Sequence, residues 1–543
     1  MSDPHPDFGL TPRQRREAVL GHRYERPGMD EGPEVWAYSD RLSYSPGERV
    51  TLFISATAPQ ASIEVCRDGA EQTALMDATG IAVGWQETPA DCSVVGCGWR
   101  GSHSFALPGD LRSGAYRVTV RIEGALCHHL FIVRPEAGRR GSAAGRILQI
   151  AATGTWTAYN TWGGSNHYEG ITGPEGKDYA PTVSLERPFG RGFVVLPAEA
   201  PRVPLTVTPP PAAPPRYPHM EWSFATGHSK KYASAGWASY DRLFFRWAEA
   251  QGYEIDLASQ HELHFEPELL EAYDCLAFVG HDEYWTWEMR DAVDAFVDAG
   301  GRAARFAGNF MWQTRLEDEG RRQVCYKYRA RDEDPLFGGP EQSRTTTSWE
   351  AAEVGRPGAA TFGLNATRGL YVGWGGCAPR GQRGFPIYRP AHWAFAGTGL
   401  YYGDQLGADA HIFGYEVDGL DYVIRNGLPE ATGLEGAPEG LEILGLGLAS
   451  TIEESADVPA DAQFLTDVDA RFVARTLMGH DGLEALEATK RGCGMIVTFP
   501  RGRGEVFHAG SCEWVAGLLR RDAQVEQVTR NVLDRYLEPR EPS

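Results

Sequence analysis

Short β-rich runs, several of them alternating between apolar and polar positions, mark the first part of the chain. They are separated by Gly, Pro and Asp, and they lie at residues 49–56, 61–69, 114–124 and 129–135. Short alternating strands with no helical period are typical of an antiparallel sandwich. We therefore predict a small β-sandwich domain at residues 31–140, preceded by a polar N-terminal arm at residues 1–30.

The pattern changes in the rest of the chain. Near-continuous apolar runs, typical of buried parallel strands, occur at residues 146–153, 253–259, 273–280 and 302–309. Amphipathic helical patterns alternate with them, for example at residues 239–252 and 522–537. This alternation predicts a doubly wound α/β domain with a parallel sheet at residues 141–540. A Pro-rich insert at 200–230 and a β-rich insertion at 310–440 are expected within it.

The charge balance narrows the function classes. The 543 residues include 73 Asp and Glu against 52 Lys and Arg, which gives a net charge of −21. A nucleic-acid-binding protein needs a basic footprint to neutralise phosphates, so this balance disfavours nucleic acid and anionic membranes as partners. We find no apolar run of about 18 residues that would span a membrane. Residues 1–21 lack the apolar segment of a secretory signal, so we expect a cytoplasmic protein.

Cysteine usage agrees with that compartment. Nine cysteines are scattered along the chain without a CxxC pair. Cys92 and Cys97 would be able to bridge in an oxidising compartment, but we favour reduced thiols. Cys275 lies inside a strand rather than at its end, which fits a small buried side chain better than a nucleophile. The absence of GxSxG and GxxxxGK[ST] motifs disfavours a serine α/β-hydrolase and a nucleotide hydrolase.

Two histidine-containing runs are weak metal candidates. Cys127, His128 and His129 are consecutive in a predicted strand, where neighbouring side chains point in opposite directions. The HELHFE run at 261–266 lacks the HExxH spacing of a zinc protease. We expect no metal at the first run and a solvated loop at the second.

The strongest chemical signal is His281-Asp282-Glu283, which directly follows the buried strand at 273–280. Ligands of open α/β sheets bind beyond the carboxyl ends of the strands. Because side chains alternate along a strand, we expect His281 and Glu283 on one face and Asp282 on the other. A helix predicted to begin at Tyr284 would direct its amide dipoles at Glu283 and favour the anion. The alternative is that Asp282 or Glu283 merely caps that helix.

A second polar loop follows the first strand of this domain, at residues 151–170. It contains Tyr159 and Tyr168 among several Trp, Gly and Asn residues. If sequential parallel strands are neighbours, both loops open onto the same edge of the sheet. The pocket would combine phenols with a carboxylate and an imidazole, and hard oxygen donors suit Fe(III) better than Zn. The alternative for this loop is an aromatic cluster that packs beneath the insertion.

Several motifs carry a resemblance to a known family. In chain order they are AYNTWGGSNHY, VSLERPF, GHDEYWTWEMRDAVDAFVDAGG, AGN, VCYK, GYEVDG and EVFHAGSCEWVAGL. Together they resemble the large (β) subunit of N,N-dimethylformamidase and its relatives, over about residues 115–540 and most specifically at 146–330. The resemblance implies a glutamine-amidotransferase-like α/β fold. It also implies one mononuclear iron, held by two tyrosines and one glutamate.

The resemblance assigns the metal ligands to positions of this chain. Glu283 of GHDEYW matches the glutamate ligand, and Tyr159 of TAYN matches the first tyrosine. Tyr168 of SNHY is our placement for the second tyrosine, with Tyr179 and Tyr217 as rivals.

Other positions complete the expected site. The resemblance implies that His281 acts beside the metal ligands and that Glu416 of GYEVDG is a further acidic residue. Asn160 and Asn309 are expected to donate hydrogen bonds in the same pocket, and His167 is an additional candidate ligand. We expect His281 to titrate near its ordinary pKa of about 6.5. The aromatic residues expected to wall the pocket are Trp162, Trp285 and Trp312.

These observations predict a hydrolase of a small amide or related C–N bond that depends on one Fe(III). The metal would polarise the carbonyl or activate water, while His281 and Glu416 would pass protons to the leaving amine. We expect a small-molecule substrate, and either a homo-oligomer or a small partner subunit is compatible with the sequence. The alternative is a non-catalytic module that binds carbohydrate or protein through a degenerate amidotransferase-like domain.

Overall fold

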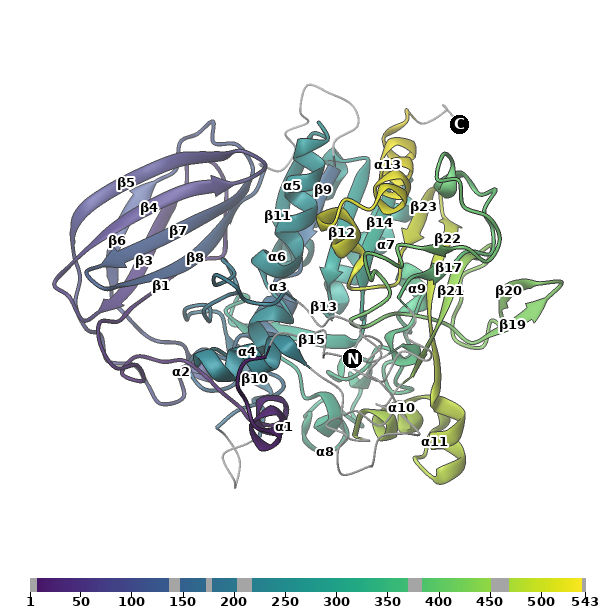
Figure 1. Ribbon diagram of the computed structural model, residues 1–543, viewed down its shortest axis with the longest axis horizontal. Helices are drawn as coiled ribbons and strands as arrows, with labels where there is room; N and C mark the ends of the chain where they lie inside the picture. The colour runs from purple at the N-terminus through teal and green to yellow at the C-terminus, as the bar shows by residue number, and fades with distance from the viewer. Residues whose placement is uncertain are drawn as a thin grey trace.

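The computed structural model describes residues 7–135, 147–171, 178–202, 217–369, 383–450 and 468–539. An N-terminal group of strands lies beside a larger body that is built around one long sheet (Figure 1). Residues 136–146, residues 203–216 of the Pro-rich insert and Cys377 lie outside the described residues. The eight cysteines within the described residues are free thiols.

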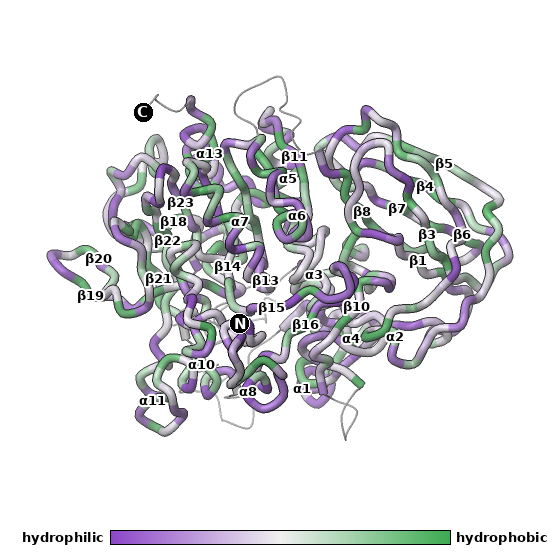
Figure 2. The backbone as a smooth tube through the Cα atoms, turned by 180° about the vertical axis from the view of Figure 1, so that it is seen from behind, coloured by the Kyte–Doolittle hydropathy of each residue, from purple (hydrophilic) through white to green (hydrophobic). Residues whose placement is uncertain are grey.

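The N-terminal strands form two sheets with one hydrophobic core between them. Leu52 from one sheet and Ile63 and Val118 from the other are fully buried in this core. Figure 2 shows hydrophobic and hydrophilic segments alternating along these strands, as the sequence pattern predicts. The first sheet has the order β1 (Val35–Ser39), β3 (Arg49–Ala56) and β6 (Gly101–Ala106). The second has the order β2 (Ser43–Tyr44), β8 (Ala125–Val133), β7 (Gly114–Ile122), β4 (Gln60–Asp68) and β5 (Gln72–Ala82).

The expected polar arm contains a helix, α1 (Pro12–Leu20). Thr11 caps it, because its hydroxyl accepts from the Gln14 amide while the Gln14 side chain accepts from the Thr11 amide. Val19 on this helix is buried against the main body. The arm is therefore part of the folded structure. The sequence contains the capping box of this helix, but the polar composition of the arm led to the prediction that it has no regular structure.

The larger body is built on a seven-stranded mixed sheet. Its order is β11 (Ile255–Ser259), β9 (Ile147–Ala151), β12 (Cys275–His281), β14 (Arg302–Gly308), β23 (Gly504–His508), β22 (Arg491–Arg501) and β21 (Glu442–Ser450). The first five strands are parallel, and β22 and β21 are antiparallel additions at one edge. The continuous apolar runs predict this arrangement, because a strand covered on both faces has no polar side.

Helices cover both faces of this sheet. One face packs on α5 (Arg242–Ala250), α12 (Trp514–Leu519) and α13 (Ala523–Leu537). The other packs on α6 (Gln260–Phe265) and α7 (Trp287–Asp298). The chain is therefore a mixed α/β protein, as predicted, while the amidotransferase-like fold and the sandwich assignment stay predictions. In the described part of the chain, no helix is both long and apolar enough to cross a membrane.

The remaining elements are short. The helices are α2 (Cys92–Val95), α3 (Thr153–Tyr159), α4 (Pro218–Thr226), α8 (Ala330–Glu333), α9 (Ala359–Phe362), α10 (Val468–Met478) and α11 (Leu483–Thr489). The strands are β10 (Thr182–Ser184), β13 (Tyr284–Thr286), β15 (Trp312–Glu317), β16 (Arg322–Val324), β17 (Phe385–Pro386), β18 (Gln405–Leu406), β19 (Tyr422–Arg425) and β20 (Leu428–Ala431).

Two local predictions are wrong. The expected loop at 261–266 is helix α6, which begins with a capping box between Ser259 and Glu262. The helix expected from Tyr284 begins only at Trp287, because residues 284–286 pair with β15 as strand β13. The capping box decides the structure of the first segment, and the pairing with β15 decides that of the second. Neither interaction is visible in the spacing of apolar residues on which the predictions were based.

Candidate active site

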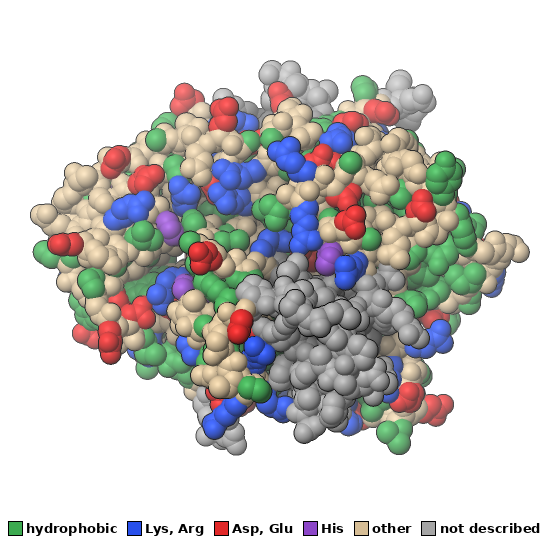
Figure 3. Space-filling view, viewed as in Figure 1, with side chains coloured by type: hydrophobic (Ala, Val, Ile, Leu, Met, Phe, Trp, Pro, Cys, Tyr) green, Lys and Arg blue, Asp and Glu red, His purple; other side chains and the backbone are tan. Residues whose placement is uncertain are grey.

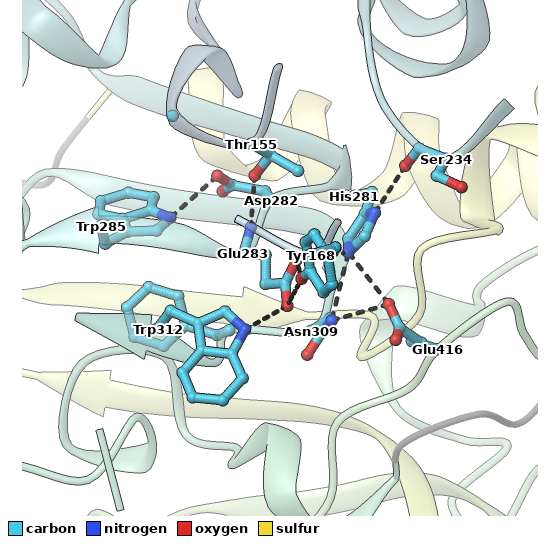
Figure 4. Close-up of polar contacts among 12 residues, drawn as sticks. Thr155, Tyr168, Ser234, His281, Asp282, Glu283, Trp285, Asn309, Trp312 and Glu416 are labelled. Carbon is cyan, nitrogen blue, oxygen red and sulfur yellow. Dashed lines mark hydrogen bonds and ion pairs between the residues drawn. The ribbon is translucent and has the colours of Figure 1, made fainter. Parts of the chain in front are cut away.

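A crevice at the carboxyl ends of β9 and β12 is the natural ligand site of this sheet. The chain passes from β9 outwards to β11 and then returns to β12 on the other side of β9. Such a reversal of strand order leaves an opening beyond the strand ends. Helix α3 follows β9 there, and Glu283 follows β12. Figure 4 shows the polar side chains that meet at this point.

The end of β12 presents different side chains to its two faces, as predicted. The His281 Nε2 atom lies 3.3 Å from Glu283 Oε2. Asp282 points the other way, where its carboxylate pairs with Arg305 and accepts from the Trp285 indole at 2.9 Å. Gly280 precedes them with a φ of +71°, and a Cβ there would meet the Tyr240 side chain at 2.5 Å. The strand end therefore requires glycine at this position.

Glu283 is held from three directions. Its amide donates to the Thr155 hydroxyl of α3 at 2.8 Å, and the Trp312 indole donates to its Oε1 at 2.6 Å. The Tyr168 hydroxyl lies 2.6 and 2.7 Å from the two carboxylate oxygens. Glu283 does not cap α7, whose N-cap is Thr286. The capping alternative is therefore wrong for this residue.

The His281 ring is held so that Nε2 faces the crevice. Its Nδ1 lies 2.7 Å from the carbonyl oxygen of Ser234, so the Nδ1 hydrogen is donated there. Nε2 lies 3.0 Å from Glu416 Oε2. Burial lowers the pKa of His281, but hydrogen bonds to Glu283 and Glu416 raise it to about 10. The expectation of an ordinary pKa is therefore wrong, because the ring lies between two carboxylates.

Asn309 and Glu416 complete this side of the crevice. The Asn309 amide nitrogen lies 2.7 Å from Glu416 Oε2 and 3.2 Å from His281 Nε2. Asn309 adopts a φ of +61°, and its backbone amide is held at 2.7 Å by Asp418. A residue other than glycine in this left-handed backbone conformation costs about 1–3 kcal/mol of folding free energy, which surrounding contacts must offset. Burial raises the pKa of Glu416.

The two predicted tyrosines meet in the crevice. Their ring centroids are 4.4 Å apart, and the Tyr159 ring lies 5.1 Å from that of His281. Burial and the charge of Glu283 raise the pKa of both phenols well above the ordinary value. The rivals lie elsewhere: the Tyr179 hydroxyl donates to the Tyr326 carbonyl, and Tyr217 packs in the hydrophobic core.

Two lysines beside these tyrosines were not predicted. The Nζ atom of Lys327 lies 3.2 Å from the centroid of the Tyr168 ring, and that of Lys231 lies 4.6 Å from it. Lys327 is fully buried, and its Nζ has no hydrogen-bond partner in the part of the chain that the structure describes. Burial lowers its pKa to about 8. The VCYK motif contains Lys327, but nothing in it indicates a contact with a residue so distant in sequence.

The donor set fits a hard cation. One phenol hydrogen cannot satisfy both oxygens of Glu283, and a cation placed among Tyr159, Tyr168 and Glu283 would replace that hydrogen. Such a cation would also reverse the effect of burial and of Glu283 on the phenol pKa values. A second set, His281, Glu416 and Cys512, has its ligand atoms within 4.8 Å of one another. The two sets are neighbours, because His281 contacts Glu283.

Several predicted pocket residues lie outside the cluster. The Asn160 side chain donates to the Pro188 carbonyl, because it follows the last residue of α3 and fixes the next loop. The His167 ring stacks on Tyr284, and Trp285 points with Asp282 to the opposite face. Trp162 packs on the N-terminal strands. Trp312 is the predicted tryptophan that contacts Glu283.

A cavity between the N-terminal strands and the larger body is separate from this cluster. It has a volume of about 400 Å³. Thr157 and Asn160 of the α3 region line it, whereas Tyr159 faces His281. The view in Figure 3 shows the surface hollowed in this part of the molecule. The cavity therefore lies across α3 from the polar cluster.

Comparison with known proteins identifies related sequences. A family model described as N,N-dimethylformamidase beta subunit-like, C-terminal, matches residues 63–527. The N,N-dimethylformamidase beta subunit of Paracoccus aminophilus is 23% identical over 480 residues, which are 81% of this chain and 54% of that protein. The one from an Alcaligenes species is 25% identical over 285 residues, 50% of this chain and 33% of that protein. The chain thus spans about half or less of the length of these relatives.

Proposed function

This chain belongs to the N,N-dimethylformamidase beta subunit-like family, and on that premise we propose that it hydrolyses a small amide or related C–N bond. The reaction is assigned to the crevice beyond β9 and β12. The observation that carries the proposal is the contact of the Tyr168 phenol with both oxygens of Glu283, next to the His281–Glu416 pair. Perturbed ionisable groups that converge in a buried crevice are typical of catalytic sites.

The proposed cofactor is one Fe(III) held by Tyr159, Tyr168 and Glu283. Phenolate and carboxylate oxygens are hard donors, which suit a hard trivalent ion. When bound, the ion would supply Lewis acidity that polarises the carbonyl group of the amide. The Trp312 indole, which donates to Glu283 Oε1, fixes the orientation of that carboxylate.

His281 and Glu416 are the proposed proton carriers. The Ser234 carbonyl holds the Nδ1 hydrogen, so Nε2 is the ring atom that exchanges protons with the crevice. Nε2 and Glu416 Oε2 are 3.0 Å apart, which is within hydrogen-bond distance. This pair takes the proton of the attacking water and delivers it to the leaving amine. Asn309 donates to Glu416 and keeps the carboxylate in that position.

Lys327 balances charge at the tyrosines. Its Nζ lies over the Tyr168 ring and has no hydrogen-bond partner among the described residues. A cation over an aromatic face is attracted to it, more strongly in a buried site. The attraction becomes larger when the phenol loses its proton. Lys327 therefore favours the tyrosinate form on which the proposed metal site depends.

Metal content and colour test the proposed site. Iron-loaded protein should show a tyrosinate-to-Fe(III) absorption band in the visible. Tyr168→Phe should lose the band and most of the iron, while the matched control Tyr179→Phe should keep both, because Tyr179 bonds to Tyr326 instead. A colourless wild-type protein with a full complement of iron would contradict tyrosinate ligation.

Cys512→Ser separates the two sets of possible ligands. The proposed set lacks Cys512, so the variant should retain its iron and its visible band. Loss of iron from this variant would assign the metal to His281, Glu416 and Cys512 instead. Iron-loaded wild-type protein that hydrolyses no amide in a broad panel of formamides and acetamides would favour the non-catalytic binding module.

The names of the relatives add one inference about assembly. Both are called beta subunits. We infer that this chain also functions with a further subunit or with further copies of itself. Light scattering of the purified chain measures its oligomeric state, and a monomer with full amide hydrolase activity would contradict the inference.

A further inference from the structure

The N-terminal arm contacts the loop that connects the two proposed tyrosine ligands. We define this tyrosine loop as residues 159–169. The Glu25 carbonyl oxygen accepts from the Gly163 amide at 2.7 Å. One ring nitrogen of His22, Nε2, lies 3.2 Å from the Gly164 carbonyl oxygen. The arm therefore contacts the middle of the loop at two consecutive glycines, whose φ values are +90° and +118°.

His22 also contacts the end of the tyrosine loop. Its Nδ1 lies 3.0 Å from Glu169 Oε2, and Glu169 directly follows Tyr168 in the chain. The other oxygen of this carboxylate, Oε1, lies 2.5 Å from the Lys230 ammonium nitrogen. A carbonyl oxygen and an ionised carboxylate only accept hydrogen bonds, so the charged ring, with a hydrogen on each nitrogen, makes both contacts. One side chain of the arm thus joins the middle of the loop to its end.

Asn166 connects this end of the loop to both tyrosines. Its side chain is fully buried. Its Nδ2 donates to the Tyr159 carbonyl oxygen at 3.1 Å, and its Oδ1 accepts from the amides of Tyr168 and Glu169, each at 2.7 Å. One amide group therefore joins the backbones of the two tyrosines, whose ring centroids are 4.4 Å apart. A shift of Glu169 must move this group or break one of its hydrogen bonds.

We propose that His22 is a positioning residue for the proposed tyrosine ligands and that it acts through Glu169 and Asn166. Its two hydrogen bonds restrict the conformations of the loop, so the phenol oxygens keep one separation before a metal ion arrives. Lys230 keeps its own contact with Glu169, so loss of His22 should loosen the loop without releasing it. The hold on the loop is independent of amide hydrolysis, whereas the effect on metal affinity rests on the proposed function.

Hydrogen exchange of the metal-free full chain tests the hold on the loop. His22→Phe keeps a ring that can stack on Tyr24 but removes both hydrogen-bond donors. Amides of residues 163–169 should exchange about tenfold faster in this variant, as expected for the loss of a hydrogen bond between charged groups. The matched control is His228→Phe, which changes a histidine that packs on Trp222 instead. This control should exchange like the wild-type protein in the same residues.

Two further variants test whether the hydrogen bonds are the cause. His22→Gln retains an amide donor, so residues 163–169 should exchange more slowly in it than in His22→Phe. His22→Phe combined with Glu169→Gln should change exchange by less than the sum of the two single effects, because the two residues share one contact. Equal exchange in the wild-type protein and His22→Phe would overturn the proposal, as would equal exchange in His22→Gln and His22→Phe. Additive effects would overturn the route through Glu169.

Iron affinity separates the positioning role from the proposed metal site. Groups that orient metal ligands typically contribute about 10–100-fold to metal affinity, so His22→Phe should bind iron more weakly by about that factor. His228→Phe should retain the wild-type affinity. Unchanged iron affinity in a variant whose loop exchanges faster would overturn the positioning role. Faster loop exchange in His22→Phe, together with a wild-type protein that binds no iron, would count against the proposed metal site alone.

Discussion

Two buried histidines, one in each part of the molecule, respond to burial in opposite ways. His129 lies on β8 among the N-terminal strands, where burial lowers its pKa to about 3. His281 lies at the end of β12, where hydrogen bonds to Glu283 and Glu416 outweigh burial and raise its pKa to about 10. Both rings are almost inaccessible to solvent. The opposite pKa shifts of the two histidines therefore arise from the carboxylates beside His281 and not from a difference in burial.

In the crevice, the pKa values of a lysine and a histidine stand in the reverse of their usual order. Burial lowers the pKa of Lys327 to about 8, below the value of about 10 for His281. An ordinary lysine titrates about four units above an ordinary histidine. In contrast, Asp282 on the other face of the strand end has a guanidinium partner in Arg305. Catalytic chemistry is therefore expected where ionisable groups perturb one another, not wherever a charge is buried.

The largest effect is expected from Glu283→Gln. Loss of the carboxylate charge should release the iron and reduce amide hydrolysis to the rate without protein. The fold should survive with a loss of no more than about 1–2 kcal/mol, because the amide can still accept from Trp312. Metal stoichiometry and thermal unfolding are the measurements. Full iron content in the folded variant would contradict the assignment of Glu283 as a ligand.

His281→Ala is expected to separate turnover from metal binding. The variant removes the Nε2 atom that contacts Glu416, so kcat should fall by about 10²–10⁴. Iron should remain bound, because the proposed ligands are untouched. Steady-state kinetics and metal analysis on the same sample check this. A variant without iron would make His281 a ligand, and unchanged kcat would remove it from the reaction.

Asp282→Asn is expected to act on stability instead. Asp282 is buried with Arg305, and removal of one member of a buried ion pair costs about 3–5 kcal/mol. The folded fraction should keep its iron, because Asp282 points away from Glu283. Chemical unfolding measures the loss, and metal content per folded molecule is the second readout. Iron loss at unchanged stability would show that the two faces are not independent.

Sequence patterns predicted the elements that follow from local rules. The apolar runs indicated β9, β12 and β14, and the alternation along a strand placed His281 and Glu283 on one face. The shared edge of parallel strands brought Tyr159 and Tyr168 to Glu283. Each of these rules depends on the backbone geometry of one element or of two neighbouring strands.

Long-range contacts explain what the sequence did not reveal. Lys327 contacts Tyr168 from a loop that is distant in sequence. Neither the spacing of apolar residues nor a sequence motif indicates such a contact. Tyr284 is in a strand because β15 lies beside it, which overrides the helical pattern that begins nearby. Asn160 is of the expected type, but at the end of α3 its amide serves the neighbouring backbone. Residue type alone does not distinguish a site from a cap.

The smallest expected effect concerns His129 and acid. Because its pKa falls to about 3 in the folded protein, the unfolded chain takes up a proton below about pH 6.5 that the folded chain does not. The free energy of unfolding should therefore fall with decreasing pH between these values, by about 1.4 kcal/mol per pH unit from this group. His129→Phe keeps a ring that can stack on Phe189, and Ser39 still donates to the Arg41 carbonyl. The variant should lose this share of the slope. His281 contributes a slope of the opposite sign only between about pH 6.5 and 10, outside this range, because its pKa is raised in the folded protein. Urea unfolding across this pH range measures the slope, and an unchanged slope would mean that His129 is already charged in the folded protein.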